Sequence, residues 1–392
     1  LIIIAQKNGN EDWYEEKGML ICRVWDKGSP FCFVQIIFAL LYFKAITSIL
    51  VQFEFHQFGG NLTTLLFPFF LFILKAAGKV TTLVMHQVVP DITDLAGHLN
   101  ITPHTIRAFI FNTLLIWFYK IVSTVPDSII VHNEILKQRF AKLTGRTDSI
   151  VIPHGLGAIK NRYKKEEARK LLGFKQKDTI IMSFGFLTWY KGADWLVREW
   201  SRMSKPKHWH LVMAGGESPN LKSRKHYQAY VKKMYDTADK HTDINITGFV
   251  EDKNIPLYFA AADIVVLPYR TIMSSSGPLA MAIAFKKPFL LSKALGPYVL
   301  DKDFSQALQG LRITKKNLLF DLTGQKLVSK IKTMLRSTSK YARLSRALYQ
   351  SRSWSVVASQ FDDAMRKSSL AKETTSVIMH RYLPVSYASA QR

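Results

Sequence analysis

The sequence predicts an α/β fold built from doubly wound parallel sheets in two units. Short runs rich in Val, Ile and Leu alternate with helical stretches along most of the chain, as in right-handed β-α-β crossovers. Several runs are apolar without alternating with polar residues, which suits strands covered by helices on both faces. The 392 residues are enough for about two domains.

The strand and helix patterns repeat on both sides of a Pro- and Gly-containing segment at 153–157, which predicts a hinge. The expected strands are 1–5, 19–25, 49–54, 80–86, 128–132, 149–152, 179–184, 209–214, 244–248, 263–268 and 288–292. The clearest expected helices are 102–125, 134–143, 193–203, 221–240, 255–261, 277–285 and 353–367. We expect domains over 1–155, with its first strand missing, and 156–345, then a helix over 346–370 that packs back across the junction and a tail over 371–392.

The net charge of +25 is unevenly distributed. Residues 1–155 contain 13 Lys and Arg against 11 Asp and Glu, so almost all of the excess lies in the second part of the chain. Such a field favours anionic partners, among them nucleotides, lipid headgroups and nucleic acid. No RNP-like or Cys/His finger motif accompanies the charge, so nucleic acid is the weaker interpretation and is not expected as a partner. Two cysteines, Cys22 and Cys32, cannot build a disulfide framework, which favours a reducing cytoplasm.

Three segments of the first domain, 31–43, 62–74 and 108–119, are strongly apolar. Each is shorter than the roughly 20 residues that a membrane-spanning helix needs. We expect buried core helices here. The alternative is that one or more of them dips into a membrane surface.

Ser275-Ser276-Gly277-Pro278 follows an expected buried strand and precedes an apolar helical run. The serines stand where an N-cap belongs and the proline where the first helical turn begins. Backbone N–H groups of Ser275, Ser276 and Gly277, together with the positive end of the helix dipole, would then face the carboxyl edge of the sheet. This arrangement predicts an anion site. A capped core helix with nothing bound is the alternative.

The second half resembles the retaining GT-B glycosyltransferases of family 4 through a series of short motifs in order. Segments of the first half are also similar to that family, among them Leu83-Val84-Met85-His86 and Ile152-Pro153-His154-Gly155. The motifs of the second half are Ser183-Phe184-Gly185-Phe186-Leu187 with Tyr190-Lys191-Gly192, Val212-Met213-Ala214-Gly215-Gly216, Thr247-Gly248-Phe249-Val250, the run from Tyr258 to Pro268, and Ser276-Gly277-Pro278 through Lys287-Pro288.

The resemblance implies two Rossmann-like domains that face each other across a cleft, and transfer of a hexose from a nucleoside-diphosphate sugar with retention of configuration. The acceptor would be a glycan or a lipid-linked hydroxyl. The apolar first domain and the basic second domain fit a cytoplasmic protein at the inner face of a membrane, with an anionic membrane surface as a further partner.

A diphosphate leaving group needs its negative charge stabilised. Lys191 follows a strand end and precedes a helix, so its ammonium should reach the carboxyl edge of the sheet. We expect it to hold the phosphates with the 275–277 amides, without a metal or other cofactor. The Asp301-Lys302-Asp303 sequence does not directly follow a strand and is interpreted as a turn or helix cap. The other expected donor-binding residues are Gly185, Gly215, Gly216, Gly248, Phe249, Val250, Arg270 and Ser274, where Gly215 and Gly216 let the backbone approach the donor and residues 248–250 edge its base.

His86 ends a strand of the first domain, and the family often has a histidine at the matching position near the donor sugar. The resemblance therefore implies His86 as a catalytic residue. The chain departs from the family at three positions: Met273 and Met281 replace the usual glutamates, and Phe186 replaces an arginine. Either a divergent enzyme uses Ser274–Ser276 and Arg270 instead, or the protein is a non-catalytic nucleotide-sugar-binding homologue.

Overall fold

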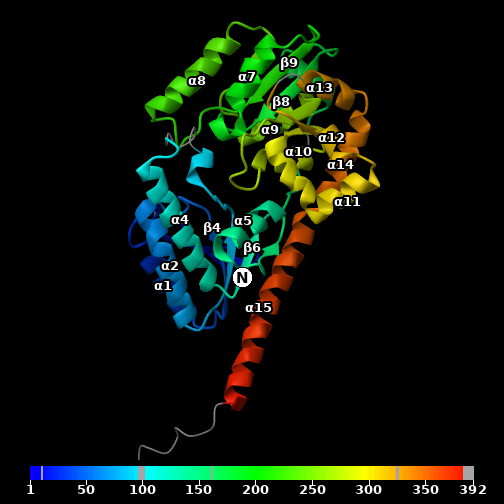
Figure 1. Ribbon diagram of the computed structural model, residues 1–392. Helices are drawn as coiled ribbons and strands as arrows, with labels where there is room; N and C mark the ends of the chain where they lie inside the picture. The colour runs from blue at the N-terminus through cyan, green and yellow to red at the C-terminus, as the bar shows by residue number, and fades with distance from the viewer. Residues whose placement is uncertain (10–11, 96–101, 160–161, 324–325, 383–392) are drawn as a thin grey trace, which may run out of the picture.

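The computed structural model describes residues 1–9, 12–95, 102–159, 162–323 and 326–382. Within these residues the strands form three sheets, which helices cover on their faces (Figure 1). The expected α/β fold class with parallel sheets is confirmed.

The C-terminal sheet has six parallel strands in the order β10-β9-β8-β11-β12-β13. From β8 the chain adds β9 and β10 toward one edge of the sheet. It then crosses back to place β11 on the other side of β8, and adds β12 and β13 toward the opposite edge. The winding direction therefore reverses between β8 and β11. In open α/β sheets the crevice that binds ligands lies at such a reversal, outside the carboxyl ends of the strands. The strands are β8 (Thr179–Phe184), β9 (Trp209–Ala214), β10 (Ile244–Ile246), β11 (Ile264–Leu267), β12 (Phe289–Ser292) and β13 (Leu319–Phe320).

Helices cover both faces of this sheet, so β11 and β12 are buried along their whole length. Helix α10 begins as the sequence predicts, because the Ser276 hydroxyl accepts a hydrogen bond from the Leu279 N–H (3.2 Å) and Pro278 lies in the first turn. The helical elements are α6 (Lys165–Leu171), η2 (Trp189–Lys191), α7 (Ala193–Arg202), α8 (Lys225–Ala238), η3 (Asp252–Asn254), α9 (Ile255–Ala261), α10 (Gly277–Ala284), η4 (Lys293–Leu300), α11 (Lys302–Gly310), α12 (Lys315–Leu318), α13 (Leu327–Leu335) and α14 (Thr338–Ser351).

The N-terminal part has a parallel sheet in the order β4-β5-β6-β7 and a separate three-stranded sheet in the order β1-β3-β2. Strand β2 is not among the expected strands. It pairs antiparallel with β3 through a two-residue turn in which Lys17 and Gly18 both have positive φ. The elements are β1 (Ile2–Gln6), β2 (Asp12–Glu16), β3 (Met19–Trp25), α1 (Cys32–Tyr42), β4 (Ser48–Phe53), α2 (Asn61–Ala76), β5 (Val80–Met85), η1 (Ile92–Leu95), α4 (Ile106–Thr124), β6 (Ser128–Val131), α5 (Glu134–Thr144) and β7 (Ile150–Val151).

The three apolar helices α1, α2 and α4 differ from the expected buried core helices. Each buries one side against the N-terminal core, through residues such as Phe33, Phe67 and Tyr119, and leaves apolar side chains exposed on its other side. The sequence shows no polar face on these helices, so composition alone could not reveal which side the core leaves uncovered.

The last helix, α15 (Trp354–Tyr382), packs on β4, β5 and β6 of the N-terminal sheet, where Val357 and Ala364 are buried against Val84 and Ile130. It continues past residue 367, the expected end of this helix, and past 370, the expected end of the C-terminal segment (Figure 1). Residues 371–382, which the sequence analysis assigned to a tail, are therefore helical. The connection that enters the C-terminal part lies beside the one that leaves it: the Leu156 N–H donates to the Arg352 carbonyl (2.7 Å), and the Trp354 N–H donates to the Leu156 carbonyl (3.2 Å).

Candidate active site

The loops after β8 and β11 meet at the point where the sheet reverses its winding. Gly185 ends β8 with φ +104°, and a Cβ built on it would lie 3.2 Å from the Lys191 Nζ and 3.1 Å from the Pro278 Cγ. The ammonium of Lys191 therefore lies between the end of β8 and the start of α10. The structure brings together three of the segments that the sequence analysis proposed for phosphate binding.

The Lys191 ammonium is held in a half-buried, largely apolar setting. It lies 5.9 Å from the centre of the Phe186 ring and 5.7 Å from that of Tyr190. Within the described parts of the chain, no carboxylate or hydrogen-bond acceptor pairs with it. Burial lowers its pKa to about 8. An ammonium desolvated without a counter-charge favours binding of an anion beside it.

Gly192, the residue after Lys191, allows the loop that carries this lysine to lie close to the end of β11. It adopts φ +72° and joins the short η2 turn to α7, and a Cβ at this position would lie only 1.9 Å from the Pro268 carbonyl oxygen at the end of β11. The loop after β8 can lie against the loop after β11 because this residue has no side chain.

We expect Gly192→Ala to lower the free energy of unfolding and to weaken nucleotide binding, because the new methyl group must push η2 away from β11. Gly173→Ala is the matched control, since Gly173 has a similar φ of +78° but open space around it. Gly192→Ala should destabilise the protein by about 1–3 kcal/mol more than Gly173→Ala in urea unfolding. Equal losses would show that strain in φ, and not contact with Pro268, dominates at this position.

Two buried tyrosines, Tyr269 and Tyr298, form hydrogen bonds with the turn at 274–276. The Ser276 N–H donates to the Tyr298 hydroxyl (2.8 Å), and the Ser276 hydroxyl shares a hydrogen bond with the Tyr269 hydroxyl (2.9 Å). This corrects the prediction that all three amides at 275–277 are free for phosphate, since the amide of Ser276 is already used. The exposed Gly277 N–H has no hydrogen-bond partner among the described residues, so it stays open to a ligand at the start of α10.

The sequence analysis proposed that Arg270 takes the place of the missing arginine of the phosphate site. In the structure its side chain is paired with another part of the protein. Its guanidinium makes a two-point ion pair with the Asp194 carboxylate (2.7 and 2.8 Å) and donates to the Trp189 carbonyl (2.6 Å). The pair ties the loop after β11 to the η2 turn and the first turn of α7. Arg270 thus positions Lys191 indirectly, with three of its five N–H groups engaged by Asp194 and Trp189.

The glycines after β9 serve close contacts between loops. A Cβ at Gly215 would lie 2.1 Å from the Gly185 carbonyl oxygen, and one at Gly216 would lie 2.5 Å from the Phe249 backbone nitrogen. The structure therefore gives a different reason for these glycines than approach to a donor. Gly248 has φ +72°, Phe249 is 68% exposed and Val250 is buried, so this loop presents an open aromatic ring beside the carboxyl ends of the strands.

The ring of His86 points into the N-terminal part and has protein partners on both nitrogens. Its Nε2 lies 2.6 Å from the Gln52 side-chain oxygen, and its Nδ1 lies 3.2 Å from the Nε2 of His132. The His132 Nδ1 donates to the Ile152 carbonyl (3.0 Å). Burial lowers the pKa of His86 to about 4 and that of His132 to about 3, so both rings are neutral at pH 7.

These contacts give both ring nitrogens of His86 protein partners, and its role as a catalytic residue stays a prediction. If both rings are neutral and His132 donates to a carbonyl, His132 accepts from the His86 Nδ1, which leaves the His86 Nε2 as an acceptor. Gln52 must then turn its amide so that its nitrogen donates. The ring of His86 thus forms a link between strand ends.

The N-terminal part contributes backbone and carboxylate groups to the same region. Gln87 forms an antiparallel backbone bridge with Ser274, so the loop after β5 touches the donor-side turn directly. The Gln87 side chain donates to the Glu54 carboxylate (2.7 Å), whose pKa is raised by burial. Burial also raises the pKa of Tyr190 to about 12, with a further contribution from the charge of Glu54 across the gap. Glu54 and Gln87 thus connect the N-terminal part with the segments around Tyr190 and Ser274.

Asp301 and Asp303 form a buried ion-pair cluster with Arg352. The guanidinium contacts Asp301 at 3.1 Å and Asp303 at 2.6 Å, and the other oxygen of Asp301 accepts from the Glu134 N–H (2.9 Å) at the start of α5. Asp301 thus caps a helix of the N-terminal part, in line with its interpretation as a helix cap. Burial raises the pKa of Asp301 to about 6 against the opposing charge of Arg352. Both carboxylates are engaged by protein, which favours a structural role.

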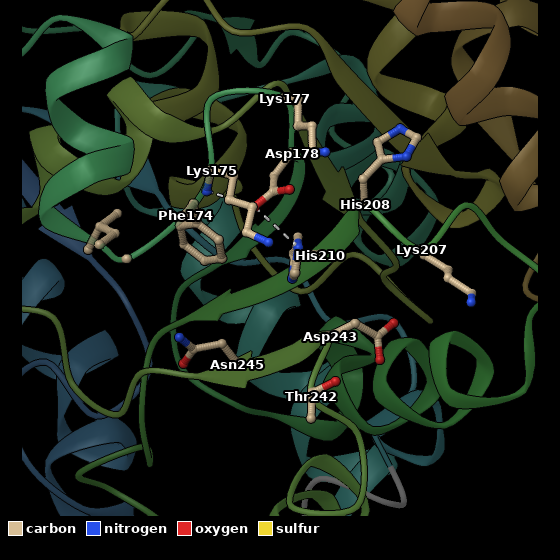
Figure 2. A pocket seen from close by; sticks show the side chains of 12 residues that line it. Phe174, Lys175, Lys177, Asp178, Lys207, His208, His210, Thr242, Asp243 and Asn245 are labelled. Atoms are coloured by element: carbon tan, nitrogen blue, oxygen red, sulfur yellow. Dashed lines mark hydrogen bonds and ion pairs between the residues drawn. The ribbon is translucent and has the colours of Figure 1, made fainter.

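Two of the hollows among the described residues bear on the position of the site. One of about 10 Å³ lies behind the 275–276 turn. The other, of about 910 Å³, opens at the amino ends of β8, β9 and β10 (Figure 2). Ligands of open α/β sheets bind at the carboxyl ends, so its size does not make it the catalytic cleft. Its polar lining includes Lys175, Lys177, Lys207, His208 and His210.

Sequence reasoning missed the residues that support the site from a distance. Tyr298, Arg352, Asp194 and His132 lack a local motif, and each acts on a residue that is remote in the chain. Met273 and Met281, which replace the glutamates, lie half-buried on the turn and on α10. Neither supplies a charge to the crevice.

Comparisons with known proteins agree with this geometry. Residues 178–336 match the family described as Glycosyl transferases group 1. No curated protein sequence matches the chain. Sucrose-phosphate synthase from Thermosynechococcus elongatus is similar in structure, with a TM-score of 0.66 and 16% identity over 94% of this chain and 89% of that one.

Two other solved structures share the arrangement. HepE from Anabaena in complex with UDP-glucose has a TM-score of 0.61 and 16% identity, covering 88% of this chain and 86% of that one. A UDP-forming α,α-trehalose-phosphate synthase from Burkholderia vietnamiensis has a TM-score of 0.64 and 13% identity, covering 94% and 92%. The C-terminal part therefore carries a glycosyl transferases group 1 domain, and the chain is a glycosyltransferase of the GT-B fold.

Proposed function

We propose that this protein transfers a hexose from a nucleoside-diphosphate sugar to a hydroxyl of a glycan or a lipid-linked acceptor, with retention of configuration and without a metal ion. The observation that carries the proposal is the Lys191 ammonium. It lies between the end of β8 and the open N–H of Gly277, without an anionic partner among the described residues. The ammonium and the start of α10 are suited to hold the diphosphate.

In this reaction the bond between the sugar C1 and the phosphate oxygen breaks while the acceptor oxygen forms a new bond to C1. The acceptor's proton passes to the departing phosphate, so the protein needs no general base. The protein binds and orients both substrates and stabilises the charge that develops on the leaving group. The engagement of His86 by Gln52 and His132 is compatible with this scheme.

Three observations support the finer parts of the proposal. The Asp301 and Asp303 carboxylates pair with Arg352, which supports phosphate binding by cationic and N–H groups without a metal. A structure of HepE contains UDP-glucose, which supports a uridine nucleotide as the first donor to test. The exposed Glu54 carboxylate, held by the buried Gln87 side chain of the loop that bridges to Ser274, is suited to contact an acceptor hydroxyl.

Binding and turnover test the proposal. Thermal shift and calorimetry with UDP, GDP and ADP should identify one preferred diphosphate. Incubation of its hexose derivatives with glycan and polyprenyl-linked acceptors should then release that nucleotide. Product with the same anomeric configuration as the donor, formed equally with and without EDTA, is expected. Inversion, or dependence on a divalent cation, would contradict the mechanism.

A non-catalytic nucleotide-sugar-binding protein is the second candidate, because Met273 and Met281 stand where the resembled family has glutamates. It predicts tight nucleotide-sugar binding with no nucleotide release for any acceptor. No binding of any diphosphate would reject both candidates.

A further inference from the structure

Three neighbouring helices of the N-terminal part carry many exposed apolar side chains. Helices α1, α2 and α4 lie beside one another, with α2 in the middle (Figure 1). Of the 26 large apolar side chains exposed among the described residues, four lie on α1, five on α2 and six on α4. More than half of the exposed apolar side chains thus lie on three helices of 11, 16 and 19 residues.

The exposed side chains follow helical spacing, so they form one stripe on each helix, on the side away from the N-terminal core. We name them the outer apolar face. On α1 they are Val34, Phe38, Leu41 and Tyr42; on α2, Leu62, Leu65, Phe69, Phe72 and Ile73; on α4, Ile106, Phe109, Ile110, Leu114, Trp117 and Ile121. The face is about 28 Å long along α4 and about 20 Å wide, on the order of 500 Å², near the upper limit for the largest apolar patch of a typical monomer.

The charge on these helices has one sign. None of the three contains Asp or Glu, and their charged residues are Lys75, Arg107 and Lys120. The Lys120 ammonium lies 5.7 Å from the centre of the Trp117 ring, which is 59% exposed. Tyr42, which is 74% exposed, contacts Trp13 with ring centres 5.3 Å apart. The exposed Trp117 beside Lys120 suits the boundary between lipid headgroups and acyl chains. The strand of Trp13 also carries the exposed Asp12, Glu15 and Glu16.

We infer that the outer apolar face docks on a lipid bilayer that carries anionic headgroups. Apolar stripes without acidic residues and with cations and aromatic rings at their edges are complementary to such a surface, which takes up apolar side chains and attracts Lys and Arg. The inference is independent of the donor-binding proposal, because none of these residues lies in the crevice.

The face lies along the bilayer surface and does not cross it. By length and composition α4 alone, among the described helices, could span a membrane. However, it packs against α2, α5 and η1, and the buried Tyr119 hydroxyl accepts a hydrogen bond from the Val89 N–H (2.9 Å). Spanning would break this packing, whereas lying flat inserts only the exposed stripe.

Co-sedimentation of the full chain with vesicles tests the inference. We expect binding to phosphatidylcholine vesicles that contain about a third phosphatidylglycerol, and at least tenfold weaker binding to phosphatidylcholine alone. Phe69→Glu with Trp117→Glu, at two exposed positions, should reduce binding at least tenfold. Leu171→Glu is the matched control: Leu171 is 61% exposed on α6, outside the face, and should bind like the unchanged protein.

Any other result of the co-sedimentation experiment contradicts the inference. No binding to either vesicle, equal binding to both, or unchanged binding by the double variant would each contradict it, provided that thermal unfolding shows the variants to be folded. Light scattering identifies the competing occupant: a dimer that the double variant converts to a monomer, without vesicle binding, would assign the face to a second copy of the chain. Nucleotide binding, measured in the same samples, reports separately on the donor site.

Discussion

Replacing Arg352 with methionine is expected to lower the free energy of unfolding by about 3–5 kcal/mol. The substitution removes the partner of two carboxylates, Asp301 and Asp303, whose side chains are 4% and 18% exposed. A buried carboxylate without a counter-charge must either stay desolvated or take up a proton, and both outcomes cost stability. Urea unfolding at pH 7 measures the loss.

Two comparisons separate this mechanism from a general packing defect. Arg366→Met is the matched control, because Arg366 pairs with Asp362 on the surface of α15 and its loss should cost less than about 1 kcal/mol. Adding Asp301→Asn and Asp303→Asn to Arg352→Met should recover most of the stability, since no unpaired charge remains. If the triple variant is as unstable as the single one, lost packing of the arginine explains the effect instead.

The stability that Arg352→Met loses should depend on pH. Without the guanidinium, burial raises the folded-state pKa values of both carboxyl groups above those of the unfolded chain. The folded state then binds more protons than the unfolded state, so stability rises as the pH falls through this range. The defect should therefore be smaller at pH 5 than at pH 8.

Replacing Lys191 with methionine is expected to weaken binding of UDP by tenfold or more, with no loss of stability in the ligand-free protein. A charged hydrogen bond to phosphate contributes about 1.5–3 kcal/mol, or roughly 10- to 150-fold in the dissociation constant. The ammonium has a pKa of about 8 in the folded protein, below its usual value. Its charged form is thus disfavoured by folding at pH 7, and removing it should leave the free energy of unfolding equal or higher.

Calorimetry between pH 7.5 and 9.5 extends the test. In the unchanged protein the affinity for UDP should fall as the pH rises above about 8, because the ammonium loses its proton; in the Lys191→Met variant the weak affinity should not vary over this range. Lys253→Met, at a lysine whose side chain is 77% exposed, serves as the control. Equal affinity in the two variants would remove Lys191 from the donor site.

Local patterns predicted much of the fold and part of the site. The strands from 179–184 to 288–292 and the start of α10 at Gly277 depend on neighbours within a few residues, which the sequence displays directly. Lys191 was predicted correctly to reach the carboxyl edge, because a position between a strand end and a helix determines it. Strand β13 was missed because its two residues, Leu319 and Phe320, include no β-branched side chain, whereas the equally short β7 consists of Ile150 and Val151.

The sequence by itself determined the alternation of strands and helices, the capped start of α10, and the placement of Lys191 at the sheet edge. The tertiary structure decided the partners of Arg270, His86, Ser276 and Asp301, and which side of the apolar helices remains uncovered. The physical reason is the distance along the chain over which each interaction acts. Capping and periodicity act over three or four residues, whereas an ion pair such as that of Arg352 and Asp301 joins groups 51 residues apart, and only folding brings them together.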